Sequence, residues 1–309
     1  MDARRRSGEG TAAASALRVS VLRLGLETFV DETAMVRSMA ARMQAQATVG
    51  VRLCVFPGLY GLCLAGPWPP DLPWQAGVRA HPGLQAGFAS VAARAARNAH
   101  LYLVPGSVLV PDGPGFVEWS GLFGPDGELL GEQVATQPDP DLPGLVLGQR
   151  LHPLDTPFGR VGLLVGRDAA VPDVARILTL QGARLLVAVR APRAPYSSTA
   201  AMAGLWQAVQ QNQVFGLESG LIGMAAGSLR DGKVGAFAPA ELEPAQSGFL
   251  GRPGYYVGDD ALVADLDFER LEELRTRRPL LRHLNIALYR RHAEVFGAAP
   301  MVMREDDDA

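Results

Sequence analysis

Alternating strand and helix signals predict that this chain folds as a single α/β domain, with helices covering a mixed sheet. The 309 residues, 48% of them hydrophobic, are enough to bury a large core. The signals alternate from residue 17 to residue 292, and no linker divides them. Residues 1–16 are predicted to be a disordered lead. Residues 293–309, which end in REDDDA, are predicted to be a solvated acidic tail.

The first half of the domain combines two helices with several short strands. Met35, Met39 and Met43 recur at helical spacing, which predicts a helix over residues 32–47 with these side chains on one face. The Gly-Pro-Asp-Gly segment at 124–127 is typical of a tight turn between two strands. The elements expected here are strands at 17–24, 51–57, 100–110, 115–123 and 128–136 and helices at 32–47 and 83–99.

The second half follows a proline-rich loop at 137–144 and repeats a strand–helix alternation. Its longest predicted helix carries an apolar stripe of Met202, Leu205, Trp206 and Val209. The elements expected here are strands at 159–166, 183–189 and 219–227, helices at 171–182 and 198–216, a strand followed by a helix over 261–279, and a short terminal helix or arm at 280–292.

Composition excludes several classes of function. The formal net charge is −3, and no basic patch with interleaved aromatic residues occurs, so we expect no nucleic-acid partner. No uncharged apolar run reaches the roughly 18 residues of a membrane-spanning helix, and the N-terminus lacks the apolar segment of a signal peptide. We therefore expect no membrane partner and a cytoplasmic location. The five histidines are scattered, so we expect neither a metal site nor a cofactor.

The segment VFPGLYGLCL, residues 55–64, leaves two interpretations open. It is either a plain exit from a strand or a site loop at the strand's carboxyl end, with Pro57 as a structural residue and Tyr60 as a candidate ligand contact. Cys54 lies within the strand and is expected to be a small buried hydrophobe. Cys63 lies nearer the strand end and could be a reactive thiol, but no cation nearby would lower its pKa, which favours an inert residue.

The segment VGLLVGRDAAVP, residues 161–172, carries the clearest site pattern. An apolar strand ends in a Gly-Arg-Asp turn just before a helix, and ligands bind at the carboxyl ends of strands in open α/β sheets. Asp168 is expected to accept backbone N–H groups at the helix start. Arg167 and Arg190, which also ends a strand, are candidate anchors for an anionic ligand; alternatively, they pair with carboxylates or are solvated. Gly166, at the tip of the turn, has no side chain.

The basic residues are almost all arginine. Lys233 is the single lysine of the chain. It lies in the segment RDGKVG, which is typical of an exposed hairpin turn. Any chemistry that needs a lysine therefore has one candidate, in a position expected to be solvent-exposed.

Several of these segments, taken in order, resemble the nitrilase or carbon–nitrogen hydrolase superfamily. The segment DTPFGRVGLLVGRDAAVPD (155–173) is similar to the family pattern fdTpfGrvGlliCyDlrfPe. Five other segments are also similar to the family. LRVSVLRL resembles its first strand, VRLCVFPGLYG its livfPElf segment, and FGPDGELLGEQVAT its turn before the catalytic lysine. LWQAVQQNQVFGLESG resembles its RAiEN helix, and ALVADLDFERLEELRTRRPLL its closing arm. The resemblance covers roughly residues 17–292. It implies an αββα sandwich that dimerises into an αββα–αββα assembly, and a Glu-Lys-Cys triad that hydrolyses amides or nitriles.

The three triad positions carry no functional side chain when the family pattern is placed on this chain. The resemblance assigns the glutamate to Gly58, the lysine to about Ala135, and the cysteine to Gly166. In the family the thiolate attacks the substrate carbon, the glutamate transfers protons, and the lysine stabilises developing charge. No catalytic residue is therefore expected to be intact. Pro57 and Asp168 remain as structural residues of the pattern.

Three hypotheses follow. The first is a pseudoenzyme whose three small residues leave an enlarged crevice, able to bind a small molecule through Tyr60, Cys63, Arg167 or Arg190. The second is an active hydrolase with relocated chemistry, in which Cys63 is the nucleophile and Glu118 or Asp168 the base. The third is an interaction role, as a homodimer or a higher homo-oligomer. We favour the first, with the third as its extension.

Overall fold

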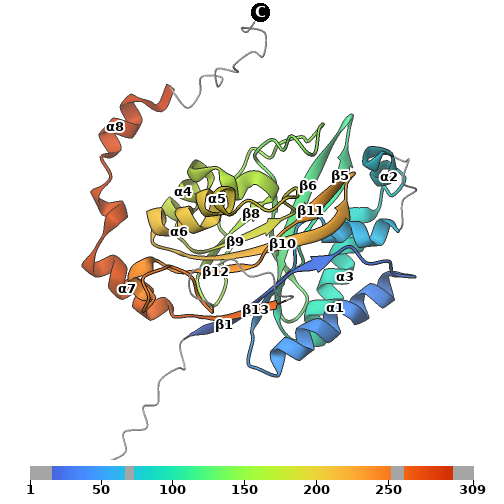
Figure 1. The fold of residues 1–309 in the computed structure, drawn as a ribbon, viewed down its shortest axis with the longest axis horizontal. Helices are drawn as coiled ribbons and strands as arrows, with labels where there is room; N and C mark the ends of the chain where they lie inside the picture. The colour runs from blue at the N-terminus through green and yellow to red at the C-terminus, as the bar shows by residue number, and fades with distance from the viewer. Residues whose placement is uncertain (1–15, 67–72, 252–260, 295–309) are drawn as a thin grey trace, which may run out of the picture.

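The computed structural model describes residues 16–66, 73–251 and 261–294, and its chain forms two sheets instead of the single mixed sheet expected from the residue pattern. The predicted lead at 1–16 and tail at 293–309 lie almost wholly outside the described residues. The sheets are stacked face to face, and helices cover both outer faces (Figure 1). This is the αββα arrangement that the resemblance implies.

The first sheet has seven strands and a mixed topology. Its members are β1 (Leu17–Leu22), β3 (Leu53–Val55), β4 (Tyr102–Val104), β5 (Ser107–Asp112), β6 (Gly115–Phe123), β7 (Leu129–Val134) and β13 (Ala261–Leu266). The order is β13-β1-β3-β4-β6-β5, and β7 pairs with β6. Strands β1, β3 and β4 run parallel, so their carboxyl ends lie along one edge.

The second sheet has six strands. Its members are β2 (Leu24–Gly25), β8 (Arg160–Val165), β9 (Ala183–Arg190), β10 (Phe215–Ala225), β11 (Ser228–Asp231) and β12 (Gly235–Phe237). The order is β11-β10-β9-β8, with β2 and β12 also paired to β10. The strand expected at 17–24 is therefore divided between the sheets: Leu17–Leu22 joins the first, and Leu24–Gly25 joins the second.

The helices are α1 (Glu32–Ala47), α2 (Trp74–Arg79), α3 (Leu84–Ala99), α4 (Pro172–Leu180), α5 (Ser198–Ala201), α6 (Gln207–Asn212), α7 (Phe268–Arg277) and α8 (Ile286–Arg291). Most of them form the two outer layers, whereas α8 lies on an arm that projects from the sheets (Figure 1). Helices α1 and α3 cover the first sheet, and α4 to α6 cover the second (Figure 1). Met35, Met39 and Met43 are fully buried, which confirms the predicted apolar face of α1.

The helix expected over 198–216 is broken into three pieces. Helix α5 passes into a π-helical segment, Met202–Trp206, before α6 begins, and Gly204 within it has non-helical dihedral angles. An ideal Cβ at Gly204 would lie 3.4 Å from the Ala169 carbonyl oxygen and 3.5 Å from Arg190 Nη1. The distortion thus occurs where this layer approaches the ends of β8 and β9, and π-bulges are often found at functional sites.

Three buried clusters correspond to the three contacts between layers. The central one combines side chains of both sheets, including Val19 and Val55 from the first and Val165 and Val187 from the second. The other two lie between the first sheet and α1/α3, and between the second sheet and α4/α6. Apolar side chains on both faces of these strands explain why their sequences are continuous hydrophobic runs.

Candidate functional site

The positions assigned to the triad lie at strand ends that meet between the two sheets. Gly58 follows β3, Ala135 follows β7, and Gly166 begins a 3-10 helix, Gly166–Ala170, directly after β8. They come from different sheets and are far apart in sequence. A residue of β6, Glu118, lies beside Ala135 and Gly166 and is linked through Ser107 to the residue after Gly58.

Glu118 is related to each position in a different way, directly at Ala135 and Gly166 and through Ser107 near Gly58. Its backbone carbonyl accepts the Ala135 N–H at 2.9 Å. Its Oε1 accepts the Ser107 hydroxyl at 2.5 Å, and Ser107 Oγ accepts the N–H of Leu59, the residue after Gly58, at 2.7 Å. Its Oε2 is 2.5 Å from the point where a Cβ at Gly166 would stand. The Glu118 carboxyl therefore fills the space in which a side chain at Gly166 would begin.

The Glu118 carboxyl is buried and hydrogen-bonded at Oε1. Ser107 Oγ accepts the Leu59 N–H and donates to Glu118 Oε1. Glu118 is only 2% exposed. Burial, together with the charges of Asp139 and Asp168, raises the pKa of Glu118 to about 7, while the Ser107 hydrogen bond and the Arg230 charge oppose this. A carboxyl with such a pKa can gain or lose a proton near neutral pH.

The space beside Gly58 is filled by main chain. The Gly58 N–H donates to the Arg190 carbonyl at 3.1 Å, and a Cβ at Gly58 would lie 2.8 Å from the Arg190 carbonyl carbon. The Arg190 side chain turns to Glu218 of β10, with Nη1 2.9 Å from Oε1, and both side chains are largely buried. A side chain at Gly58 or at Gly166 would therefore begin in space that neighbouring atoms already occupy.

Asp168 ties two strand ends together. Its Oδ1 accepts the N–H groups of Thr136 and Gln137 at 2.9 and 3.1 Å, and also the Thr136 hydroxyl. Its Oδ2 accepts the Val165 N–H at 3.3 Å. We expected Asp168 to cap a helix start. Only the Val165 N–H, just before the 3-10 helix, matches that expectation, and the other N–H donors come from the residues that follow β7. Asp168 is fully buried and works as a structural anchor beside Ala135.

The other candidate ligand contacts do not converge on Glu118. Tyr60 and Cys63 lie in a 3-10 helix, Tyr60–Ala65, within the cluster under α1 and α3. The Tyr60 hydroxyl donates to Glu27 at 3.0 Å, and Cys63 Sγ accepts the Glu27 N–H at 3.3 Å. Burial raises the pKa of the Cys63 thiol to about 12, so it is a weak nucleophile. Arg167 is exposed.

Comparisons with known proteins identify the family. The sequence profile described as Carbon-nitrogen hydrolase matches residues 30–226, a span that includes all three positions. The chain belongs to the carbon–nitrogen hydrolase family. It is 27% identical to omega-amidase NIT2 of Homo sapiens over 207 residues, which are 63% of this chain and 71% of the relative.

Solved structures show the same fold. A carbon–nitrogen hydrolase from Helicobacter pylori superposes with a TM-score of 0.70 at 17% identity, over 90% of this chain and 98% of the other. An amidase from Nesterenkonia sp. AN1, captured with an acetamide moiety added covalently at its active-site cysteine, superposes with a TM-score of 0.68 at 20% identity, over 90% and 97% of the two chains. The αββα layers of this chain are thus those of carbon–nitrogen hydrolases.

The buried positions of two acidic residues, Glu118 and Glu218, were not predicted from the sequence. The pattern named Glu118 only as a possible base, and it did not single out Glu218. The available signal was their position: each lies within an apolar strand segment, GFVEWSGLF or FGLESGLIG, and glutamate is almost never fully buried unless it is paired. Lys233 was placed on an exposed turn, but its side chain is only 21% exposed, and it pairs with Asp231 at 2.7 Å.

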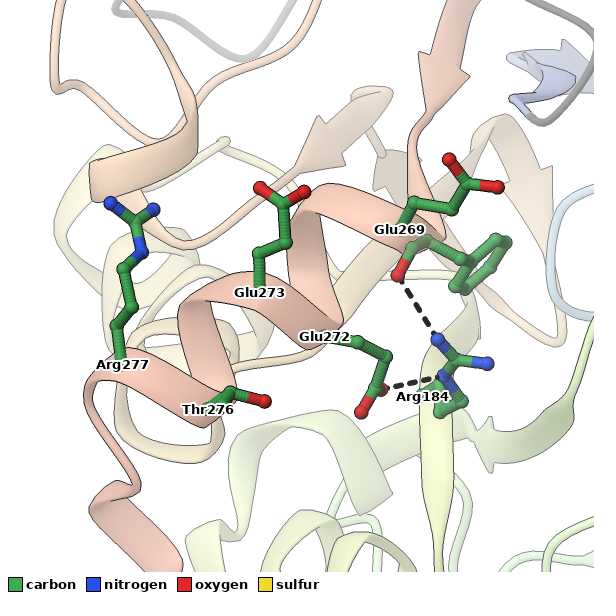
Figure 2. A pocket seen from close by; sticks show the side chains of 7 residues that line it. Arg184, Glu269, Glu272, Glu273, Thr276 and Arg277 are labelled. Atoms are coloured by element: carbon green, nitrogen blue, oxygen red, sulfur yellow. Dashed lines mark hydrogen bonds and ion pairs between the residues drawn. The ribbon is translucent and has the colours of Figure 1, made fainter.

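A separate surface groove lies along α7 and includes none of the three positions. Arg184 of β9 donates to the Phe268 carbonyl at 3.0 Å and pairs with Glu272 at 2.9 Å, and Glu269, Glu273, Thr276 and Arg277 line the rest (Figure 2). Its ion pairs join the helix to the sheet. Among the described residues, no group of three or more histidine, cysteine or acidic side chains is arranged to hold a metal ion. In the same part of the chain, no helix combines the length and apolar character needed to cross a membrane.

Proposed function

We propose that this carbon–nitrogen hydrolase family member does not hydrolyse amides or nitriles, and that it has kept the fold as a scaffold. One observation carries the proposal: the Glu118 carboxyl occupies the space in which a side chain at Gly166 would begin, with Oε2 2.5 Å from the would-be Cβ. Hydrolysis by the family's route needs a thiolate, a base and a cation. Gly58, Ala135 and Gly166 supply none of these groups.

Ammonia release tests the proposal directly. The purified protein is incubated with ω-amides, short aliphatic amides, N-carbamoyl compounds and nitriles, beside human omega-amidase NIT2 as a positive control. We expect no release above the buffer rate from the native chain. Turnover that persists after repurification and is lost in Glu118→Gln would overturn the proposal, because the crevice would then contain relocated chemistry.

The alternative with Cys63 as nucleophile has little structural support. Its thiol is 3% exposed and belongs to the cluster under α1 and α3, whereas Glu118 and Asp168 face the space between the sheets. If the ammonia assay were positive, Cys63→Ala would decide this alternative. A loss of turnover in that variant would support Cys63, and unchanged turnover would exclude it.

We also propose that the scaffold forms a homodimer through α4 and the C-terminal arm. Helix α8 has six residues, none of them buried, and a helix this short is not stable alone. Its Ile286 and Tyr289 line an apolar groove with Ile177 and Leu180 of α4, and these four side chains are 42% to 53% exposed. A second copy offers the complementary apolar surface.

Light scattering coupled to size exclusion tests the dimer. We expect twice the chain mass for the native protein and a monomer for Ile177→Glu and Tyr289→Glu. Glu128→Gln, a substitution of an exposed glutamate that does not line the groove, is the control and should leave the mass unchanged. A monomeric native protein at tens of micromolar would refute this interface.

A further inference from the structure

Helices α1 and α3 lie side by side on the outer face of the first sheet (Figure 1). A groove of 670 Å³, the α1/α3 groove, lies between their exposed sides. The residues that line it are spaced three or four apart along each helix, so each helix contributes one face. They include Arg37 of α1, Arg94 and Arg97 of α3, and His100, the residue that caps the C-terminus of α3.

The lining of the α1/α3 groove is cationic. Its three arginines are always charged, and none of the described residues that line it is an aspartate or a glutamate. The carboxylate that pairs with them is that of Glu32, whose Oε2 lies 3.9 Å from Arg94 Nη1. The groove therefore has an excess of positive charge in a chain whose formal net charge is −3.

Stabilisation of a helix end explains only part of this charge. Arg97 and His100 lie at the C-terminus of α3, where the helix dipole favours cations. The effect of the dipole falls off within the last turn. Arg94 lies more than one turn before that end, and Arg37 lies in the second turn of α1, whose N-terminal half does not favour a cation. These two arginines need another reason.

The guanidinium groups are positioned and still have unused donors. Arg97 Nε donates to the Asp126 carbonyl at 2.9 Å, and Arg94 Nη2 donates to the Thr33 hydroxyl at 3.3 Å. A guanidinium carries five N–H donors, so each of these bonds restrains a side chain and leaves most of its donors available. Arg37 is exposed, and no hydrogen bond or ion pair joins its side chain to another described residue.

The base of the groove is uncharged. Val36 and Ala40 of α1 line it and are only 4% and 5% exposed. Gln44 Nε2 donates to the Asn98 carbonyl at 3.0 Å, which joins the two helices and restrains the distance between them. The arginines thus border a small apolar surface that is open to solvent, and a ligand reaches it without any displacement of the sheets.

We propose that the α1/α3 groove binds a small molecule that carries phosphate groups. Guanidinium groups recognise phosphate oxygens through pairs of N–H donors. A compact anion fits this groove better than a nucleic acid does, because the positive charge is local and the net charge of the chain is negative. The groove lies outside the first sheet, whereas the three triad positions lie between the sheets. The proposal therefore goes beyond the scaffold function and does not depend on it.

Isothermal titration calorimetry with inorganic pyrophosphate tests the site in a phosphate-free buffer of low ionic strength. We expect one ligand per chain and an affinity that falls as salt is added. ADP is titrated in parallel. Equal affinities would support recognition of the phosphates alone, and tighter binding of ADP would support an added contact with the apolar base. Absence of binding for both ligands at millimolar concentration would overturn the proposal.

Arginine substitutions locate the binding. Arg37→Gln and Arg97→Gln should each weaken pyrophosphate binding about tenfold, because each removes a charge-assisted contact. Arg270→Gln, at an exposed arginine of α7 outside the groove, is the matched control and should bind like the native chain. Equal weakening in all three variants would overturn the proposal, because binding would then follow the overall charge of the chain.

Chemical modification locates the site on the native protein and covers the case in which a variant does not fold. Phenylglyoxal modifies accessible arginines, and peptide mass spectrometry measures the extent at each position. Pyrophosphate should protect Arg37, Arg94 and Arg97 and leave Arg270 unprotected. Equal modification of the three groove arginines with and without pyrophosphate would refute the site. Ammonia release by the native protein would refute the scaffold function but leave this result untouched.

Discussion

The space that a side chain would need is occupied in different ways at Gly58 and at Gly166. At Gly166 the missing volume is filled by a side chain, the Glu118 carboxyl, at 2.5 Å from the would-be Cβ. At Gly58 it is filled by the main chain of Arg190, at 2.8 Å. A substitution can shorten the Glu118 side chain, but it cannot remove the end of strand β9. A side chain at Gly166 therefore needs one compensating change, at Glu118, whereas a side chain at Gly58 needs the backbone of Arg190 to move.

The largest effect is expected from Gly58→Glu. The new side chain must displace the end of β9, so we expect a loss of about 3 kcal/mol in the free energy of unfolding. Urea denaturation measures it. Gly83→Glu is the control, because a Cβ at Gly83 meets nothing within 4 Å. A Gly58→Glu protein as stable as the control would show that the Arg190 main chain yields readily, and the contrast between the two turns would fail.

Gly166→Cys should cost less, about 2 kcal/mol. One part comes from the clash with Glu118, and another from the positive φ of Gly166, +58°, which side chains rarely adopt. Gly113→Cys isolates the second part, since its φ is +53° and its Cβ would meet nothing within 4 Å. The double variant Gly166→Cys with Glu118→Ala should show a favourable coupling of about 1 kcal/mol. Strict additivity in this cycle would contradict the assignment of Glu118 as the occupant.

A variant that carries all three side chains of the family's triad meets the same packing constraints. A chain with Gly58→Glu, Ala135→Lys and Gly166→Cys places a lysine at a position only 2% exposed and two side chains in occupied space. We expect that chain to be largely insoluble and to release no ammonia from amides. Activity in this variant, measured on soluble protein, would show that the crevice rearranges more easily than its packing indicates.

Asp168→Asn should have a smaller effect, about 1 to 2 kcal/mol. In the native protein both oxygens of Asp168 accept backbone N–H groups. In the asparagine variant one of these oxygens becomes an NH₂ group, which faces an N–H donor and cannot accept from it. Thermal unfolding measures the loss. The exposed change Asp173→Asn, at the start of α4, is the control. Equal melting temperatures for the two variants would remove Asp168 as the anchor between the ends of β7 and β8.

The last prediction concerns the rate at which the thiols react, with no change expected in stability. Burial raises the pKa of both Cys54 and Cys63 to about 12. The thiolate fraction at pH 8 is then about a thousandth of that of a free cysteine, and labelling by a disulfide reagent should slow in proportion. The urea-unfolded chain provides the reference rate. Labelling of the folded protein at the unfolded rate would revive Cys63 as a nucleophile.

The local elements could largely be predicted, because their signals are local. The spacing of Met35, Met39 and Met43 determines the buried face of α1, and the apolar runs locate β8 and β9. The break in the helix over 198–216 could not be predicted, because it arises where Gly204 meets Ala169 and Arg190 from other layers. The division of residues 17–25 between two sheets likewise depends on partners distant in sequence.

The sequence by itself determined the family pattern, the α/β alternation and the absence of functional side chains at Gly58, Ala135 and Gly166. These are properties of residue type and order. Only the tertiary structure decided what stands in their place, because an occupied space depends on atoms from β5, β6 and β9 that are distant along the chain. For the same reason only the structure shows that Glu118 is buried beside other acidic groups. Its pKa follows from burial and from the charges of Asp139 and Asp168, which folding brings around it.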